Sequence, residues 1–104
     1  MTYRVALTEL AQQDFDELDG SLKKQVADCI RKKLMVSPDY GEPLGNKHGI
    51  NLSGLHRLRF NDRRHRIIYK LEEDDARQIT IIAIGPRKDE LIYKIAESRL
   101  HLKP

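Results

Sequence analysis

Arginines crowd one short segment of the chain and could hold a phosphate group. Between Ser53 and Tyr69, five arginines stand against one acid, Asp62. The five are Arg57, Arg59, Arg63, Arg64 and Arg66. A guanidinium is planar and permanently charged, and its paired N–H groups match the oxygens of a phosphate. Arginine at this density predicts an anionic partner for the segment.

Arg57 and Arg59 are predicted to share one face of a strand. Apolar and basic residues alternate over 55–60, so the apolar side chains lie on the opposite face. In a hairpin whose turn is centred on 62–63, Arg59 pairs with Arg66. Directly opposed like charges destabilise a hairpin by about 0.2–1 kcal/mol. We therefore expect an anion to lie between the two side chains.

The end of the last predicted strand brings a further arginine to this cluster. Pairing of 67–71 with 77–84 places Arg87 near Arg64 and Arg66. A helix begins there, and Tyr93 lies at the edge of its apolar stripe, with its hydroxyl near the same cleft. Guanidinium groups and a phenol make a poor metal site, but they suit phosphate binding and proton transfer. The pattern predicts a nucleic-acid backbone as ligand, with no metal and no cofactor.

Hydrophobic periodicity predicts the elements that position these residues. They are a strand at 3–7, helices at 8–18 and 22–34, strands at 55–60, 67–71 and 77–84, and a helix from 88 onward. This β-α-α-β-β-β-α order indicates an α+β fold in which a small antiparallel sheet carries an N-terminal helical hairpin and a C-terminal helix. In the first helix Ala11 and Phe15 face the core, and Asp14 faces water. The Pro- and Gly-rich segment 37–51 is predicted to be a loop with little regular structure.

Length and composition restrict the architecture further. A chain of 104 residues fits one domain, spanning 1–104, and its 39% hydrophobic and 34% charged residues favour a folded globule. The longest apolar run, 79–85, is far shorter than the roughly 20 residues of a membrane span. The N-terminal residues enter a strand pattern directly, so we expect no secretory signal and a cytoplasmic location. The single cysteine, Cys29, cannot form an internal disulfide, and its position on a helix favours the core.

Some candidate residues also have a purely structural interpretation. Arg63 and Arg64 fall in a turn, where arginines are commonly solvated and only attract an anion from a distance. Tyr93 can pack its ring and leave its hydroxyl in water. Tyr3 and Tyr69 are expected in the core. The histidines are interpreted as surface or packing residues, and they are His48, His56, His65 and His101.

The chain resembles the RelE/ParE superfamily of type II toxins, in particular its RelE branch, over nearly its whole length. The segments that carry the resemblance are Leu10-Ala11, 15–18, 52–59, 66–69 and 82–87, followed by Tyr93. The resemblance implies the element order predicted above. It also implies cleavage of messenger RNA in the ribosomal A site, by attack of a ribose 2′-hydroxyl on the adjacent phosphate.

The resemblance also assigns roles to individual residues. It implies Arg66, Arg87 and Tyr93 as catalytic residues and Arg57 and Arg59 as RNA-binding residues, with Arg63 and Arg64 as further RNA contacts. The second-strand pair is commonly lysine in the best-known members and is arginine here. Arginine practically cannot lose its proton, so the pair is expected to bind phosphate, which leaves Tyr93 for proton transfer. The identity of the general base stays open.

Three functions fit these observations. The first is a toxin that cuts messenger RNA on the ribosome, arrests translation and is held inactive in a hetero-oligomer with a cognate antitoxin. The second is a ParE-like inhibitor that binds DNA gyrase and cuts no RNA. The third is a non-toxic, degenerate family member, which the missing lysines keep open. None of the three involves a membrane.

Overall fold

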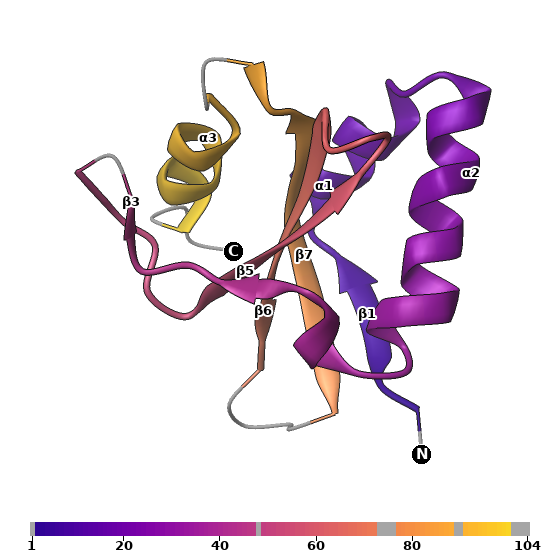
Figure 1. Cartoon of the computed structure of the whole chain (residues 1–104), viewed down its shortest axis with the longest axis horizontal. Coiled ribbons are helices and arrows are strands. Elements are labelled where there is room, and N and C mark those ends of the chain that lie inside the picture. The colour runs from indigo at the N-terminus through magenta and orange to yellow at the C-terminus, as the bar shows by residue number, and fades with distance from the viewer. Residues whose placement is uncertain (1, 48, 73–76, 89–90, 101–104) are drawn as a thin grey trace.

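A mixed five-stranded sheet organises the fold. The computed structural model of the chain describes residues 2–47, 49–72, 77–88 and 91–100. The strand order is β1-β7-β6-β5-β2. The bounds are β1 Arg4–Leu7, β7 Gln78–Pro86, β6 His65–Leu71, β5 Leu55–Phe60 and β2 Glu42–Pro43. Figure 1 shows this sheet between α3 on one side and α2 on the other.

The sheet is not wholly antiparallel, which corrects the prediction from sequence. β1 pairs with β7 in parallel, while the other three pairings are antiparallel. A hairpin turn fixes two neighbouring strands as antiparallel, but β1 and β7 are separated by about two thirds of the chain. The segment between them, from α1 to β6, provides the long connection that a parallel pair requires. β7 therefore lies between β1 and β6.

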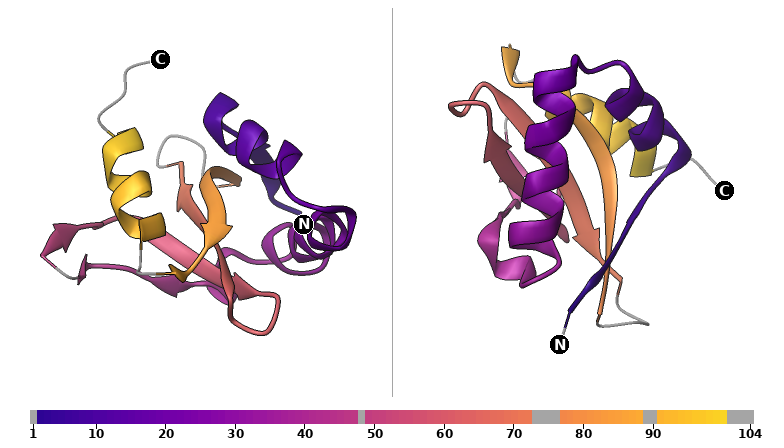
Figure 2. Two further views of the ribbon diagram at one scale, coloured as in Figure 1. Left: turned by 90° about the horizontal axis from the view of Figure 1, so that it is seen from above. Right: turned by 90° about the vertical axis from the view of Figure 1, so that its right-hand side faces the viewer.

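Three α-helices cover the two faces of the sheet (Figures 1 and 2). They are α1 Glu9–Asp16, α2 Gly20–Cys29 and α3 Leu91–Leu100, and α2 continues into one wider π-helical turn, Ile30–Leu34. Thr8 caps α1 by accepting from the amide of Ala11 at 3.1 Å, and Asp19 caps α2 by accepting from that of Leu22 at 2.8 Å. Thr8 thus starts α1, and Asp19 starts α2 at the predicted break.

Each face of the sheet buries its own apolar cluster. The cluster under α1 and α2 consists of Ala11, Val26, Cys29, Leu34, Leu58, Phe60, Ile67, Tyr69, Ile79, Ile81 and Ile84. The cluster under α3 contains Leu55, Ile68, Ile82, Ile92, Tyr93 and Ala96, among others. The core positions of Cys29 and Tyr69 confirm the prediction from sequence. Because the pleat alternates, the β5 arginines lie on the α3 face, opposite Leu58 and Phe60.

The segment predicted as an irregular loop contains short regular elements. A 3-10 turn, Pro38–Tyr40, leads into β2, which adds an edge strand to the sheet beside β5. A small hairpin of β3, Asn46–Lys47, and β4, Ile50–Asn51, follows. Two-residue strands are too short to produce an alternating pattern, so periodicity misses them.

The registers of the central hairpins agree only in part with the prediction. Arg59 pairs with Arg66, as predicted. In the next hairpin Leu71 pairs with Ile79, and a bulge between Ile68 and Tyr69 shifts the register by one residue. A bulge adds one residue to one strand and cannot be read from alternation.

Asp14 does not face water, which corrects another prediction from sequence. Its carboxylate accepts bonds from the Arg99 guanidinium at 2.6 and 3.1 Å and from the amide of Ile84 at 3.0 Å. Arg99 also donates to the carbonyl of Ile82 at 2.9 Å. These bonds fasten α1 and α3 to β7. Within the described ranges, no helix has the length and apolar character to cross a membrane.

Candidate functional site

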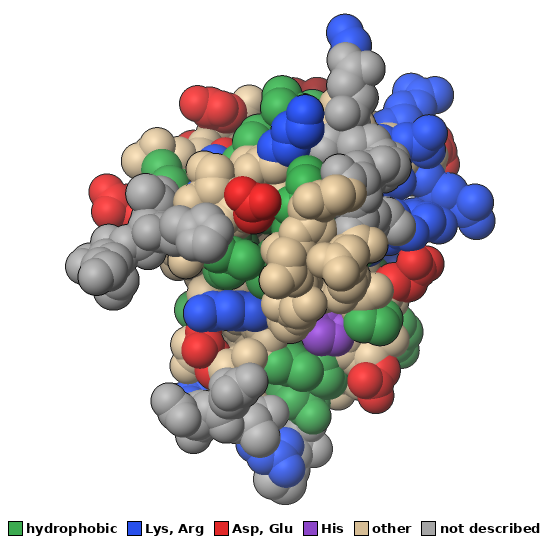
Figure 3. Space-filling view, turned by 90° about the vertical axis from the view of Figure 1, so that its left-hand side faces the viewer, with side chains coloured by type: hydrophobic (Ala, Val, Ile, Leu, Met, Phe, Trp, Pro, Cys, Tyr) green, Lys and Arg blue, Asp and Glu red, His purple; other side chains and the backbone are tan. Residues whose placement is uncertain are grey.

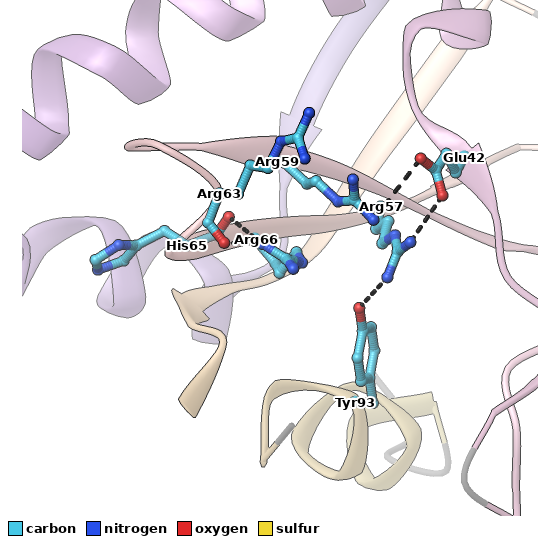
Figure 4. Close-up of polar contacts among 7 residues, drawn as sticks. All are labelled: Glu42, Arg57, Arg59, Arg63, His65, Arg66 and Tyr93. Atoms are coloured by element: carbon cyan, nitrogen blue, oxygen red, sulfur yellow. Dashed lines mark hydrogen bonds and ion pairs between the residues drawn. The ribbon is translucent and has the colours of Figure 1, made fainter. Parts of the chain in front are cut away.

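The two β5 arginines meet a carboxylate and a phenol on the α3 face of the sheet. Arg57 donates from Nη1 to the Tyr93 hydroxyl at 2.8 Å and from Nη2 to Glu42 Oε2 at 2.7 Å. Arg59 Nη2 lies 3.9 Å from Glu42 Oε1. Figure 4 shows Tyr93 pointing from α3 to Arg57, with Glu42 reaching the same guanidinium from β2. A network of three charges and one phenol results.

Glu42 is the site residue that sequence reasoning missed. It lies in the segment 37–51, whose Pro and Gly content indicates a loop and gives no sign of a functional carboxylate. Pairing of β2 with β5 puts Glu42 directly opposite Arg57. The Glu42 side chain is 59% exposed, whereas that of Arg57 is 11% exposed. The carboxylate is therefore open to solvent, whereas most of the Arg57 side chain is covered.

The partners of Arg57 stabilise its protonated form. Burial by itself lowers the pKa of this guanidinium, but the hydrogen bonds to Tyr93 and Glu42 and their charges outweigh that effect. The pKa of Arg57 therefore lies above its ordinary value, and the side chain remains a cation. A permanent cation here can bind phosphate and cannot act as a base.

Arg66 is buried and faces its own turn. The residue is 4% exposed, and its Nη1 donates to the carbonyls of Arg63 at 2.5 Å and His65 at 3.2 Å. The turn it holds contains three successive non-glycine residues in the left-handed region, with φ of 52° at Asn61, 52° at Asp62 and 68° at Arg63. Each such residue costs about 1–2 kcal/mol. Arg66 thus braces a strained turn while its Cα stays opposite Arg59.

Three buried donors on this face have no partner among the described residues. They are the Nε atoms of Arg57, Arg59 and Arg66. An unsatisfied buried donor costs about 1–3 kcal/mol, and more when it carries charge. An anion bound along β5 and β6 would satisfy these donors. This is consistent with the prediction that an anion offsets the repulsion between the paired arginines.

The remaining predicted basic residues form a second group at the end of the β5–β6 hairpin. Arg63, Arg64, Arg87 and Lys88 line a pocket of about 460 Å³ together with Asp62, His65 and Pro86. The backbone amide of Arg87 donates to the carbonyl of Arg64 at 2.8 Å, so the end of β7 is tied to the turn. Figure 3 shows Lys and Arg side chains gathered at one edge of the molecule. The structure therefore places Arg87 beside Arg64, as the sequence predicts.

Tyr93 is more enclosed than the sequence predicts. Its position on α3 suggests the edge of the apolar stripe, but the residue is 1% exposed and belongs to the core under that helix. Its hydroxyl does reach the arginines, through the bond from Arg57. Tyr93 therefore couples α3 to β5.

The described histidines pack on the face of the sheet opposite the β5 arginines. His56 stacks on Tyr69 with ring centroids 5.3 Å apart, and His65 lies 5.3 Å from the Phe60 ring. Burial lowers the pKa of both imidazoles below the ordinary value. His48 and His101 fall outside the described residues. Among the residues that the structure describes, no group of three or more His, Cys, Asp and Glu side chains is arranged to hold a metal ion.

Comparison with known proteins identifies a family model and several related folds. Residues 5–91 match the family model described as the ParE toxin of a type II toxin–antitoxin system, parDE. That match covers most of the chain. No curated protein sequence was found to match it.

Solved structures share this fold at low sequence identity. The RelBE2 toxin–antitoxin complex of Mycobacterium tuberculosis matches with a TM-score of 0.70 at 22% identity, over 84% of this chain and 100% of that chain. A mutant of the E. coli toxin RelE in the free state also gives 0.70, at 16% identity over 96% and 99%. The isolated E. coli RelE toxin gives 0.67 at 15% identity, over 94% and 98%. These matches confirm the predicted α+β fold.

Proposed function

This chain belongs to the RelE/ParE superfamily of type II toxin–antitoxin toxins, and we propose that it is a ribosome-dependent endoribonuclease that cuts messenger RNA in the ribosomal A site. The observation that carries the proposal is the row of buried, unpartnered Nε donors of Arg57, Arg59 and Arg66 beside a carboxylate and a phenol. Phosphate oxygens can accept hydrogen bonds from such donors. The carboxylate can accept a proton and the phenol can donate one.

The arginines bind and neutralise the phosphate. Arg57 and Arg59 hold the scissile phosphodiester through their planar forks. Arg87 contributes charge from the end of β7, and Arg66 contributes charge from beneath the strand. Arg63 and Arg64, exposed at the hairpin turn, bind the flanking backbone. Negative charge grows on the phosphate oxygens as the 2′-oxygen attacks, so fixed cations lower the barrier.

We assign the role of general base to Glu42, since the second-strand pair is arginine here and cannot take up a proton. Its exposed carboxylate removes the proton of the ribose 2′-hydroxyl. The O2′–P bond then forms, the P–O5′ bond breaks, and a 2′,3′-cyclic phosphate and a 5′-hydroxyl result. We assign to Tyr93 the proton that is delivered to the leaving 5′-oxygen. Arg57 links the two groups, since it binds both.

A cognate antitoxin is the expected partner. Structures that match this fold include toxin–antitoxin complexes. A basic cleft on a small toxin is silenced by an acidic segment that folds over it, since opposite charge both steers and satisfies the arginines. The active toxin works in the cytoplasm, where ribosomes translate.

Gyrase inhibition is the second candidate, because the matching family model is described as a ParE toxin. A gyrase inhibitor acts by binding and needs no base or acid. The two candidates differ in whether messenger RNA acquires new 5′ ends in the presence of ribosomes. The degenerate alternative predicts neither cleavage nor gyrase inhibition.

Mapping of messenger RNA 5′ ends in a translating cell-free extract tests the proposal. We expect new ends at fixed positions within codons, only when ribosomes are present. Replacing Arg87 by alanine is expected to lower cleavage about 10²-fold, since it removes one cation from the transition state. Arg4→Ala removes the same charge from β1, at the far edge of the sheet, and is expected to leave cleavage unchanged.

The same extract distinguishes the alternatives. Intact messages together with inhibited DNA supercoiling would overturn the nuclease proposal in favour of gyrase binding. Intact messages with normal supercoiling would support the degenerate alternative. Cleavage of ribosome-free RNA at the same positions would contradict the dependence on the ribosome.

A further inference from the structure

A buried tyrosine hydroxyl lies beneath the segment that delivers Glu42. Tyr69 on β6 is fully buried, and its hydroxyl donates to the carbonyl of Pro38 at 2.6 Å. The backbone of Gly41 bonds to the same hydroxyl. One phenol thus holds both ends of the short segment 38–41, which leads directly into Glu42.

Gly41 lets this segment lie flat against the sheet. A Cβ at position 41 would fall 2.1 Å from the Tyr69 hydroxyl oxygen and 2.7 Å from the carbonyl oxygen of Arg57. Real Cβ atoms do not approach so closely, so any larger residue must push the segment away from β5. The close approach sets the distance at which β2 pairs with β5 and at which Glu42 meets Arg57.

We propose that Tyr69 is a positioning residue for the cleavage reaction, whose hydroxyl fixes segment 38–41 so that the Glu42 carboxylate stays on Arg57 and Arg59. This inference rests on the proposed function of Glu42 as the general base. Glu42 is exposed and belongs to a two-residue edge strand, so little else in its own element holds it in place. The rigid support comes instead from β6, at the centre of the sheet.

The chemistry of the hydroxyl suits a permanent structural donor. Burial raises the pKa of Tyr69 to about 12, so the group stays protonated and neutral at physiological pH. The hydroxyl can therefore donate its hydrogen bond to the Pro38 carbonyl throughout the physiological pH range. Were the residue only a core filler, its ring, stacked on His56, would suffice and the hydroxyl would be dispensable.

Tyr69→Phe tests the proposal because it removes the hydroxyl and keeps the ring. In single-turnover cleavage on programmed ribosomes, we expect the maximal rate to fall about 10- to 100-fold, since a small displacement of a catalytic group has effects of this size. The toxin concentration at half-maximal rate is expected to stay the same. Amide hydrogen exchange across 41–44 is expected to quicken. Tyr40→Phe deletes an exposed hydroxyl on the same segment and is expected to change none of these quantities.

A double variant separates positioning from a general structural role. In a Glu42→Gln background, Tyr69→Phe is expected to cause no further loss of rate, because the group it positions is already disabled. A full additional loss, or wild-type cleavage by Tyr69→Phe alone, would overturn the proposal. Gly41→Ala provides a second route, and it is expected to reproduce the Tyr69→Phe defect by displacing β2.

Failure of the proposed function leaves the positioning inference testable. Should the wild-type protein cut no RNA, amide exchange decides the matter on its own. Faster exchange at 41–44 in Tyr69→Phe but not in Tyr40→Phe supports positioning of Glu42 by Tyr69. Unchanged exchange in both variants overturns it.

Discussion

Replacing Glu42 by glutamine is expected to slow messenger RNA cleavage by about 10²- to 10⁴-fold, the range over which a positioned general base acts. Glutamine keeps the length of the side chain and can still accept a bond from Arg57, whose Nη2 lies 2.7 Å from the carboxylate. It cannot take up a proton from the 2′-hydroxyl. The fold and the binding of RNA are therefore expected to persist while the chemical step fails.

Single-turnover rates at saturating toxin, on ribosomes carrying a defined codon in the A site, measure this effect. Asp39→Asn is the matched control, since Asp39 is an exposed carboxylate in the same segment. Wild-type rates in Glu42→Gln would show that the carboxylate only neutralises Arg57 and Arg59. In that case the base would have to be sought elsewhere in the site.

Removing the carboxylate of Asp14 is expected to lower the free energy of unfolding by about 2–4 kcal/mol. The Asp14 and Arg99 side chains are 18% and 16% exposed, so the Asp14→Ala variant leaves a largely buried cation without its partner. The amide of Ile84 also loses its acceptor. Because Arg99 lies near the end of α3, the same change loosens the helix that carries Tyr93.

Urea denaturation followed by circular dichroism measures the loss. Asp16→Ala removes an exposed carboxylate from the same helix and is expected to cost less than about 0.5 kcal/mol. In a double-mutant cycle, Asp14→Ala and Arg99→Ala are expected to be strongly non-additive. An equal effect of the two aspartate variants would contradict the role of this ion pair in the fold.

Local signals in the sequence determined most of the elements. Each of these signals spans only a few residues. They are the caps at Thr8 and Asp19, the alternation over 55–60 and the hairpin turn after Phe60. For that reason the helix break, the order of the longer elements along the chain and the pairing of Arg59 with Arg66 could be predicted. Hydrogen bonds and side-chain periods of this range are set by the backbone itself.

Contacts between distant segments were decided only by the tertiary structure. Glu42 reaches Arg57 because a two-residue edge strand pairs with β5, and Asp14 meets a partner 85 residues away because α1 and α3 close around β7. The direction of β1 and the bonds of Arg66 to its own turn have the same origin. Residue types and their spacing predict which chemistry is available. The partner that each charged side chain contacts depends on how elements far apart in the chain pack together. Such packing leaves no periodic pattern in the sequence.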